Sequence, residues 1–327
     1  METLLAHAQE LVDNTGYDEI SLVSLSSADY SCLHDLIPAL IKRFKEQGVS
    51  VSLPSLRIDS FSIQLAQEVQ QVRKSGLTFA PEAGTQRMRD VINKGVTEQN
   101  LEEAVSAAFR AGWSSVKLYF MIGLPTETDE DVKGIIELAH KVSSIFRQIK
   151  GRGGAKITVS VSSFVPKPHT PFQWHPQISV DEIRRKQAYL RSLVRDRNIS
   201  LNWHDAETSF LEGAFSRGDR RLGQVLIEAW RRGSRFDGWS EHFKFALWME
   251  AFEAVGLDPA FYANRERTPD ELLPWDHISA SVDKSFLLRE YEQAVQEAFT
   301  PDCRRDICSS CGVCPGLGAS VIDWGNK

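Results

Sequence analysis

Short runs of β-branched and other apolar residues alternate with longer stretches of helical periodicity through the first half of this chain. Five such runs start at Glu19, Val49, Leu77, Ser115 and Lys156, roughly 30 to 40 residues apart. Strands that alternate with helices at this spacing are typical of βαβ units, which pair their strands in parallel. Because the runs are apolar or β-branched at successive positions, we expect a parallel sheet covered by helices on both faces.

Periodicity alone does not separate a closed barrel from an open, doubly wound sheet. The sequence contains neither a G-x-G-x-x-G after the first run nor a G-x-x-x-x-G-K-[ST]. Both motifs bind nucleotide phosphates at the start of a helix, so their absence disfavours a nucleotide-binding open sheet.

Helix-start signals support the alternation. Thr128 and Ser179 each precede an acidic residue by three positions, which is the spacing of a capping box. After about residue 200 the pattern favours helices, and the sequence TPDEL at 268–272 predicts a further helix start. We therefore predict two parts, a core over residues 1–200 and a mostly helical region over residues 201–327.

Composition narrows the setting of the protein. The 327 residues carry a net charge of −6, so the whole chain has no attraction for nucleic acid. We find no apolar run of about 18 residues and no basic-plus-apolar leader, which predicts a cytoplasmic protein without a membrane partner. Residues 184–235, however, hold twelve Lys or Arg against six acids. This local excess indicates either solvated helix faces or an anionic partner such as RNA.

Four of the five cysteines are grouped near one end of the chain. Cys303, Cys308, Cys311 and Cys314 follow the pattern C-x4-C-x2-C-x2-C-P, whereas Cys32 is isolated. Closely spaced thiolates can converge on one metal centre. The C-x2-C-x2-C run before a proline resembles a ferredoxin segment, and four thiolates also suit structural zinc. We predict a metal site at these four cysteines, holding either an iron–sulfur cluster or zinc.

Function in parallel α/β folds lies at the carboxyl ends of the strands. Each of the five runs is followed there by polar, glycine or proline residues, the most notable being Ser26, Ser27, Arg57, Glu82, Gly123 and the proline-rich stretch 166–171. Glu82 lies between a proline and a turn of small residues, where a glutamate is awkward to pack and useful for binding a ligand. Helix capping, ion pairing and turn formation are the alternatives for the other positions.

Four longer stretches together resemble the radical S-adenosylmethionine (radical SAM) superfamily, in the branch of the methylthiotransferases and the Elongator catalytic subunit. They are residues 54–60, 77–95, 112–131 and 162–174. The remainder, through the cysteine cluster, resembles an uncharacterised radical SAM family in which a longer N-terminal region usually precedes this core. The resemblance implies an α/β fold, a partial (β/α)6 barrel followed by a mostly α region.

The resemblance also implies cofactors. A [4Fe–4S] cluster would bind SAM and cleave it reductively, with an electron donor as partner, and the 5′-deoxyadenosyl radical would act on an unknown substrate, an RNA, a protein or a small molecule. By strand order, the resemblance assigns SAM contacts as follows: Ser26 and Ser27 to the methionine amino group, Arg57 and Glu82 to the methionine carboxylate or the ribose, and Met121, Ile122, Gly123 and Val165 to the adenine.

One departure from the family pattern limits these expectations. The family's cluster ligands come from C-x3-C-x2-C after the first barrel strand, and this sequence has no such motif. The run at Glu19 matches the family's second strand, so the first strand and the cluster loop are expected to be missing. The chain is then a fragment or split product of an enzyme, or a non-catalytic remnant such as a metal-stabilised module that binds RNA or protein.

Overall fold

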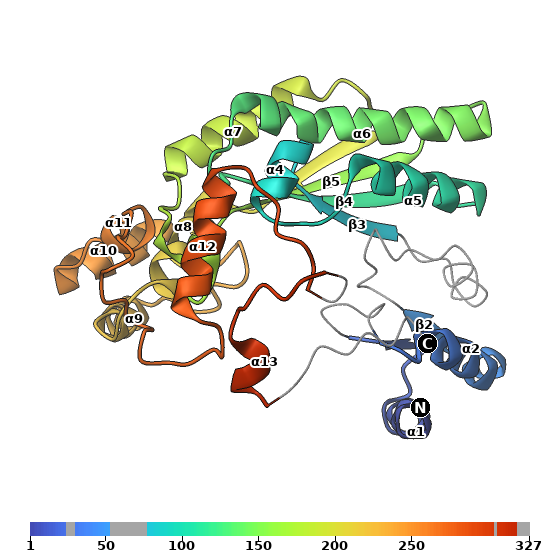
Figure 1. Ribbon diagram of the computed structural model, residues 1–327, viewed down its shortest axis with the longest axis horizontal. Coiled ribbons are helices and arrows are strands. Elements are labelled where there is room, and N and C mark those ends of the chain that lie inside the picture. The colour runs from blue at the N-terminus through green and yellow to red at the C-terminus, as the bar shows by residue number, and fades with distance from the viewer. Residues whose placement is uncertain (24–29, 53–76, 304–305, 319–327) are drawn as a thin grey trace.

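Parallel strands and helices alternate in the computed structural model, which describes residues 1–23, 30–52, 77–303 and 306–318. Two strands form a small parallel sheet, β1 (Glu19–Ser21) and β2 (Ser50–Ser52). Four more form a parallel sheet in the order of the chain, β3 (Leu77–Glu82), β4 (Ser115–Ile122), β5 (Lys156–Ser163) and β6 (Ile199–Trp203). The predicted parallel α/β architecture is confirmed, and it is consistent with a partial radical SAM barrel (Figure 1).

The strand expectations need two corrections. The described strands form two separate sheets rather than one, because no ladder joins β2 to β3 within the described residues. The sheet also contains β6, which was not predicted, although Ile199, Leu201 and Trp203 alternate with polar residues as a half-buried strand requires. β6 crosses the boundary expected at residue 200, and the division into two domains stays a prediction.

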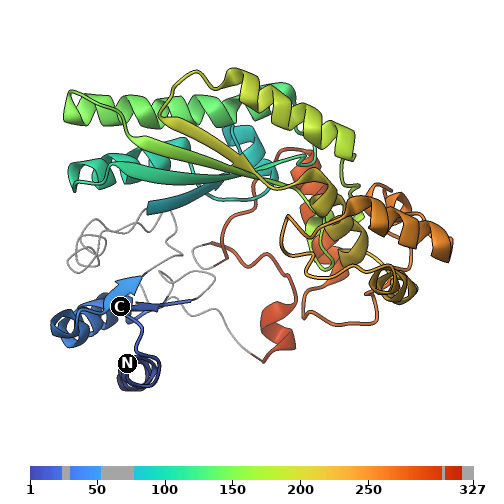
Figure 2. The same cartoon turned by 180° about the vertical axis from the view of Figure 1, so that it is seen from behind.

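Helices cover one face of the four-stranded sheet. The covering helices are α5 (Glu98–Arg110), α6 (Asp129–Lys150) and α7 (Val180–Leu193), which lie on the same side of the strands in opposite views (Figures 1 and 2). Strand residues such as Phe79, Leu118 and Val159 point to this side and are at most 1% exposed. Their packing against the helices forms the main core.

The opposite face of this sheet is polar, which corrects the expectation of burial on both faces. Lys117 and Tyr119 of β4 alternate with the core residues, and the Lys117 Nζ lies 2.7 Å from the Tyr119 hydroxyl. On the neighbouring strands, the Ser200 hydroxyl donates to the Thr158 hydroxyl at 3.2 Å. This alternation was not recognised in the sequence. Serine, threonine and lysine occupy every second position, but serine and threonine are compatible with both buried and solvated strands. A polar face of this kind suits the lining of a partly closed barrel.

The N-terminal unit consists of the two-stranded sheet with α1 (Glu2–Thr15) and α2 (Leu33–Phe44), followed by the short helix η2 (Lys45–Gln47). Its core joins Leu36 and Leu40 of α2 to Val51 of β2. The expected SAM contacts Ser26, Ser27 and Arg57 fall outside the described residues.

Two predicted helix starts are confirmed. Thr128 forms a complete capping box with Asp131 at the start of α6, and the Ser179 hydroxyl accepts from the Glu182 amide at 3.2 Å at the start of α7. The connections around the sheet contain α4 (Gln86–Val91) and η4 (Pro171–Trp174). The expected proline-rich segment therefore ends in a short helical turn.

The C-terminal region is mostly helical, as predicted. It contains α8 (Ala206–Ser216), α9 (Leu222–Arg231), α10 (Phe245–Val255), α11 (Pro259–Ala263), α12 (Lys284–Val295) and α13 (Val313–Gly316). The helix expected at 268–272 is wrong, because these residues form a turn. Glu271 was expected to complete the start of a helix. It instead accepts two hydrogen bonds from Arg265, at 2.6 and 2.8 Å, and this ion pair fixes the turn. In the part of the chain that the structure describes, no helix is long and apolar enough to span a membrane.

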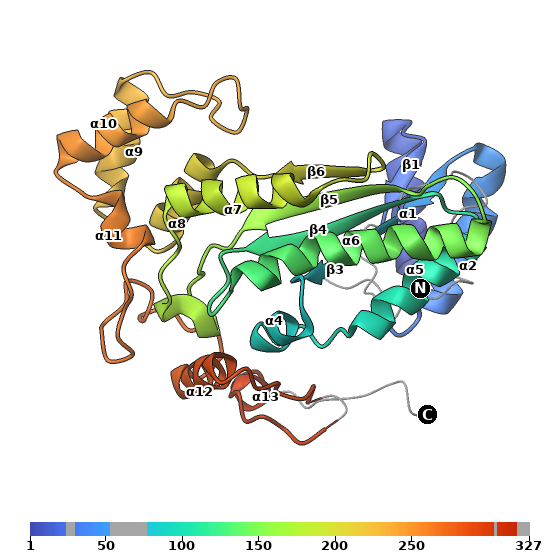
Figure 3. The same cartoon turned by 90° about the horizontal axis from the view of Figure 1, so that it is seen from above.

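Helix α12 packs at the carboxyl end of the four-stranded sheet, next to α4 (Figure 3). Its Ala294 shares a small core with Ala83 and Leu124, which follow β3 and β4. The end of the chain is therefore attached to the strand ends where function is expected.

Candidate functional site at the strand ends

The carboxyl ends of β3, β4 and β5 meet along one edge of the sheet. Glu82 is paired in register with Phe120, and Ile122 with Ser163. The Phe164 amide continues the ladder by donating to the Ile122 carbonyl at 2.8 Å. Five of the eight expected SAM contacts fall on described residues, and they lie at the ends of three adjacent strands or directly after them.

Glu82 has an unusual backbone at the last position of β3. Its φ angle is +69°, in the left-handed region that non-glycine residues seldom adopt, and the register of β3 shifts between Phe79 and Glu82. The carboxylate is partly exposed and lies 3.1 Å from the Lys94 Nζ. A strained residue persists only where its surroundings hold it, and such residues concentrate at ligand sites. Glu82 is therefore positioned to offer a fixed carboxylate at this edge.

The other described contacts differ in their surroundings. Ile122 is fully buried in the helix-side core, so its side chain does not reach the polar face. The Gly123 amide already donates to Glu127 at 2.9 Å, and an added Cβ at Gly123 would lie 2.7 Å from the Ile178 side chain. Turn formation and packing therefore account for this glycine. Met121 packs in the small core at the strand ends, and Val165 is half-buried after β5.

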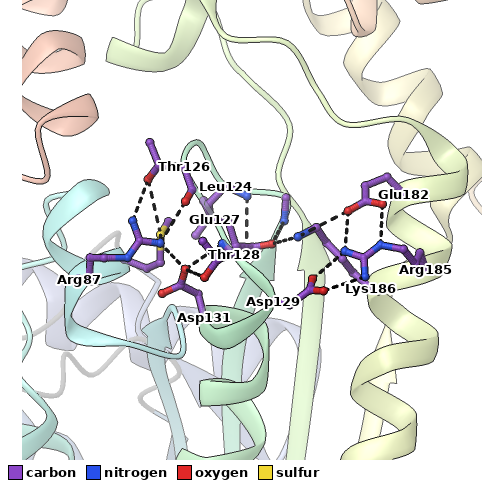
Figure 4. A network of polar contacts seen from close by, with 12 residues as sticks. Arg87, Leu124, Thr126, Glu127, Thr128, Asp129, Asp131, Glu182, Arg185 and Lys186 are labelled. Carbon is purple, nitrogen blue, oxygen red and sulfur yellow. Dashed lines mark hydrogen bonds and ion pairs between the residues drawn. The ribbon is translucent and has the colours of Figure 1, made fainter.

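A buried ion pair behind this edge was not predicted (Figure 4). The Glu127 side chain is 4% exposed and lies 2.9 Å from the Lys186 Nζ. Burial raises the pKa of Glu127 above its ordinary value, although Lys186 and the amides of Gly123 and Leu124 act in the opposite direction. The pair joins α7 to the turn that follows β4. The position of Glu127 four residues after Gly123 is visible in the sequence, but its partner on α7 is not.

A second polar cluster fixes the start of α6 against α4 (Figure 4). Asp131 accepts hydrogen bonds from the Thr85 hydroxyl at 2.5 Å and from the Thr128 amide at 2.8 Å, and it forms an ion pair with Arg87. Burial acts to raise the pKa of Asp131, but the hydrogen bonds outweigh it and lower that pKa to about 2. Arg87 also contacts Glu297 at 2.7 Å. This cluster therefore attaches the segment after α12 to the strand-end region.

The four C-terminal cysteines are free thiols. Burial raises the pKa of the Cys303 thiol, and the charges of Asp302, Cys308, Cys311 and Cys314 act in the same direction. Among the described residues, no three His, Cys, Asp or Glu side chains are placed to hold a metal ion. The metal site at the cysteines therefore stays a prediction.

Many cations of the basic segment 184–235 have partners within the protein. Arg184 pairs with Glu207, Arg185 with Asp129 and Glu182, and Arg232 with Glu228 and Glu250. Arg217 is fully buried and donates to the carbonyls of His175 and Arg265 at 2.7 and 3.1 Å. These pairs account for much of the local excess of cations, and an RNA partner stays a prediction.

Comparison with known proteins gives a match to one family model and matches to two individual proteins. Residues 1–139 match the family model of the radical SAM superfamily. The chain is 31% identical over 230 residues to an uncharacterised protein, MJ0966, of Methanocaldococcus jannaschii, an alignment that covers 69% of this chain and 47% of that protein. It is 30% identical over 107 residues to an uncharacterised methyltransferase, PH0819, of Pyrococcus horikoshii, covering 32% of this chain and 23% of that protein. The chain thus spans about half the length of the first relative and about a quarter of the second.

Proposed function

Because this chain is a radical SAM superfamily protein, we propose that the carboxyl edge of β3, β4 and β5 forms part of an S-adenosylmethionine site. The observation that carries the proposal is the strained Glu82 at the end of β3, next to the end of the parallel strand β4. Strand ends in parallel α/β folds are where ligands bind. The polar face of the same sheet leads up to this edge.

The chain's own residues have distinct roles in this site. The Glu82 carboxylate accepts hydrogen bonds from the ribose hydroxyls or the methionine amino group, and Lys94 fixes its position. Met121 and Val165 supply apolar contacts for the adenine, and Ile122 contributes its backbone. Ser26, Ser27 and Arg57 complete the set by strand order. Glu127 and Lys186 are positioning residues that hold the turn after β4.

The residues present do not fit the family's cluster. A bound [4Fe–4S] cluster would supply the electron that releases a 5′-deoxyadenosyl radical from SAM. Its C-x3-C-x2-C ligands are absent from this sequence, and the spacing C-x4-C-x2-C-x2-C does not replace them. Without these ligands, this chain alone binds SAM but does not cleave it.

Equilibrium dialysis with labelled SAM tests the proposal. We expect saturable binding by the full chain, with competition by S-adenosylhomocysteine, because both ligands offer the same ribose and adenine to Glu82, Met121 and Val165. ATP shares the adenosine but lacks the amino-acid moiety, so it should compete less well. Absence of saturable binding by folded protein, or equal competition by ATP, would contradict a SAM site.

The missing cysteine motif leads to a separate prediction about activity. After anaerobic reconstitution with iron and sulfide, and with dithionite as reductant, the chain alone should form no 5′-deoxyadenosine above a protein-free control. The second candidate, a non-catalytic binding module, makes the same prediction. Formation of 5′-deoxyadenosine in proportion to protein would show that other residues of this chain support the cluster.

A further inference from the structure

The segment Cys308–Gly312 turns tightly around one cysteine sulfur. Its sequence is Cys-Ser-Ser-Cys-Gly, and the Ser310 amide donates to the Cys308 Sγ at 3.4 Å. Ser310 and Gly312 have φ angles of +55° and +86°, which turn the backbone around the Cys308 sulfur. Amide hydrogen bonds to sulfur stabilise thiolate ligands and tune the metal that they hold.

Helix α12 and its N-cap residue Asp283 hold this turn in place by hydrogen bonds to the backbone carbonyls of the turn. The Asp283 amide donates to the Cys311 carbonyl at 2.9 Å. Arg289 reaches the carbonyls of Ser309 and Ser310 at 3.2 and 3.4 Å. An added Cβ at Gly312 would lie 2.6 Å from the Asp283 carboxyl group, so only glycine fits there. The turn is thus fixed by the protein without a disulfide, and its thiols remain available.

We propose that Cys303, Cys308, Cys311 and Cys314 together form one four-thiolate site for a thiophilic metal centre, seated on α12. Cys308 and Cys311 flank the preformed turn, and Cys314 follows Cys311 by the same spacing. The four thiols are not gathered in ligand geometry, so metal binding brings the Cys303 and Cys314 sulfurs to the turn that carries Cys308 and Cys311. Each thiol loses its proton as its sulfur becomes a ligand, so binding releases protons and strengthens as the pH rises.

Metal analysis of the full chain tests this site directly. Anaerobic protein is incubated with Zn²⁺ alone or with ferrous iron and sulfide, desalted, and assayed for metal and acid-labile sulfide per chain. We expect about one zinc in the first case or about four irons with a similar amount of sulfide in the second. Either result supports the four-thiolate site, and the sulfide content separates the two kinds of centre.

Cysteine variants locate the site. After competition with a chelator, the Cys308→Ser and Cys311→Ser variants should each hold at least about tenfold less metal than the unaltered chain, because each substitution removes one ligand from the fixed turn. Cys32→Ser is the matched control, since Cys32 is an exposed thiol on another element, and it should retain metal like the unaltered chain. Circular dichroism confirms that each variant is folded. Failure of the folded protein to bind either centre, or an equal loss in Cys32→Ser, would overturn the proposal. Because SAM plays no part, the outcome is independent of the SAM site.

Discussion

Replacing Gly84 by alanine is expected to destabilise the protein by about 3 kcal/mol or more, because the added methyl group collides with backbone rather than with a movable side chain. A Cβ at Gly84 would lie 2.3 Å from the Asp131 carbonyl oxygen and 2.4 Å from the Ile135 amide nitrogen. Gly134 faces Gly84 across the same contact. Alanine would therefore push the loop after β3 away from α6 and loosen the Asp131 cluster together with the position of Glu82.

Urea denaturation followed by circular dichroism measures this effect. The matched control is Gly223→Ala in α9, where an added Cβ would meet no atom within 4 Å. Alanine there should stabilise the protein by about 0.5–1 kcal/mol, because it lowers the entropy of the unfolded chain and favours the helix. A Gly84→Ala midpoint equal to that of the unaltered protein would show that the loop and α6 are not in this close contact.

Lys186→Met is expected to cost about 3–5 kcal/mol in the free energy of unfolding, because it leaves the buried Glu127 carboxylate without its cation. Lys186 is 4% exposed, and its Nζ lies 2.9 Å from Glu127. The double variant Lys186→Met with Glu127→Gln should recover part of this loss, since it removes the uncompensated charge. Chemical unfolding of the two single variants and the double variant gives the coupling between the residues.

The Lys186→Met deficit should depend on pH. Burial already raises the pKa of Glu127 in the folded state, and loss of Lys186 removes an opposing effect and raises it further. A group with a raised folded pKa favours folding when protonated, so its contribution to stability is lost as the pH rises through that pKa. The deficit should thus be smaller at about pH 5 than at about pH 8. A deficit that does not change with pH would indicate that Glu127 remains protonated or exposed throughout.

Sequence patterns predicted the parts of the fold that depend on local chemistry. The five runs of β-branched residues are strands, and Thr128 and Ser179 cap helices, because propensity and capping act over a few residues. β6 was missed although its alternation was present in the sequence. The polar face of the sheet was missed because serine and threonine are compatible with both buried and solvated strands.

Long-range contacts could not be predicted in the same way. Lys186 of α7 pairs with Glu127 in the turn after β4, and Arg87 pairs with Glu297 near the other end of the chain. These partners are brought together only by packing of α7 and α12, for which no local pattern exists. Glu82 was singled out by its place between a proline and small residues, and the structure adds the left-handed backbone that fixes it there.

The affinity of the Glu82→Gln variant for SAM, measured by equilibrium dialysis, tests the proposed site most directly. Glutamine keeps the size of the side chain but replaces a charge-assisted hydrogen bond by a neutral one, so affinity should fall about five- to tenfold. The matched control is Glu103→Gln, an exposed glutamate on α5, on the helix-covered side of the sheet, which should bind SAM like the unaltered chain. Equal affinities for the Glu82→Gln and Glu103→Gln variants would contradict a SAM site at this strand end.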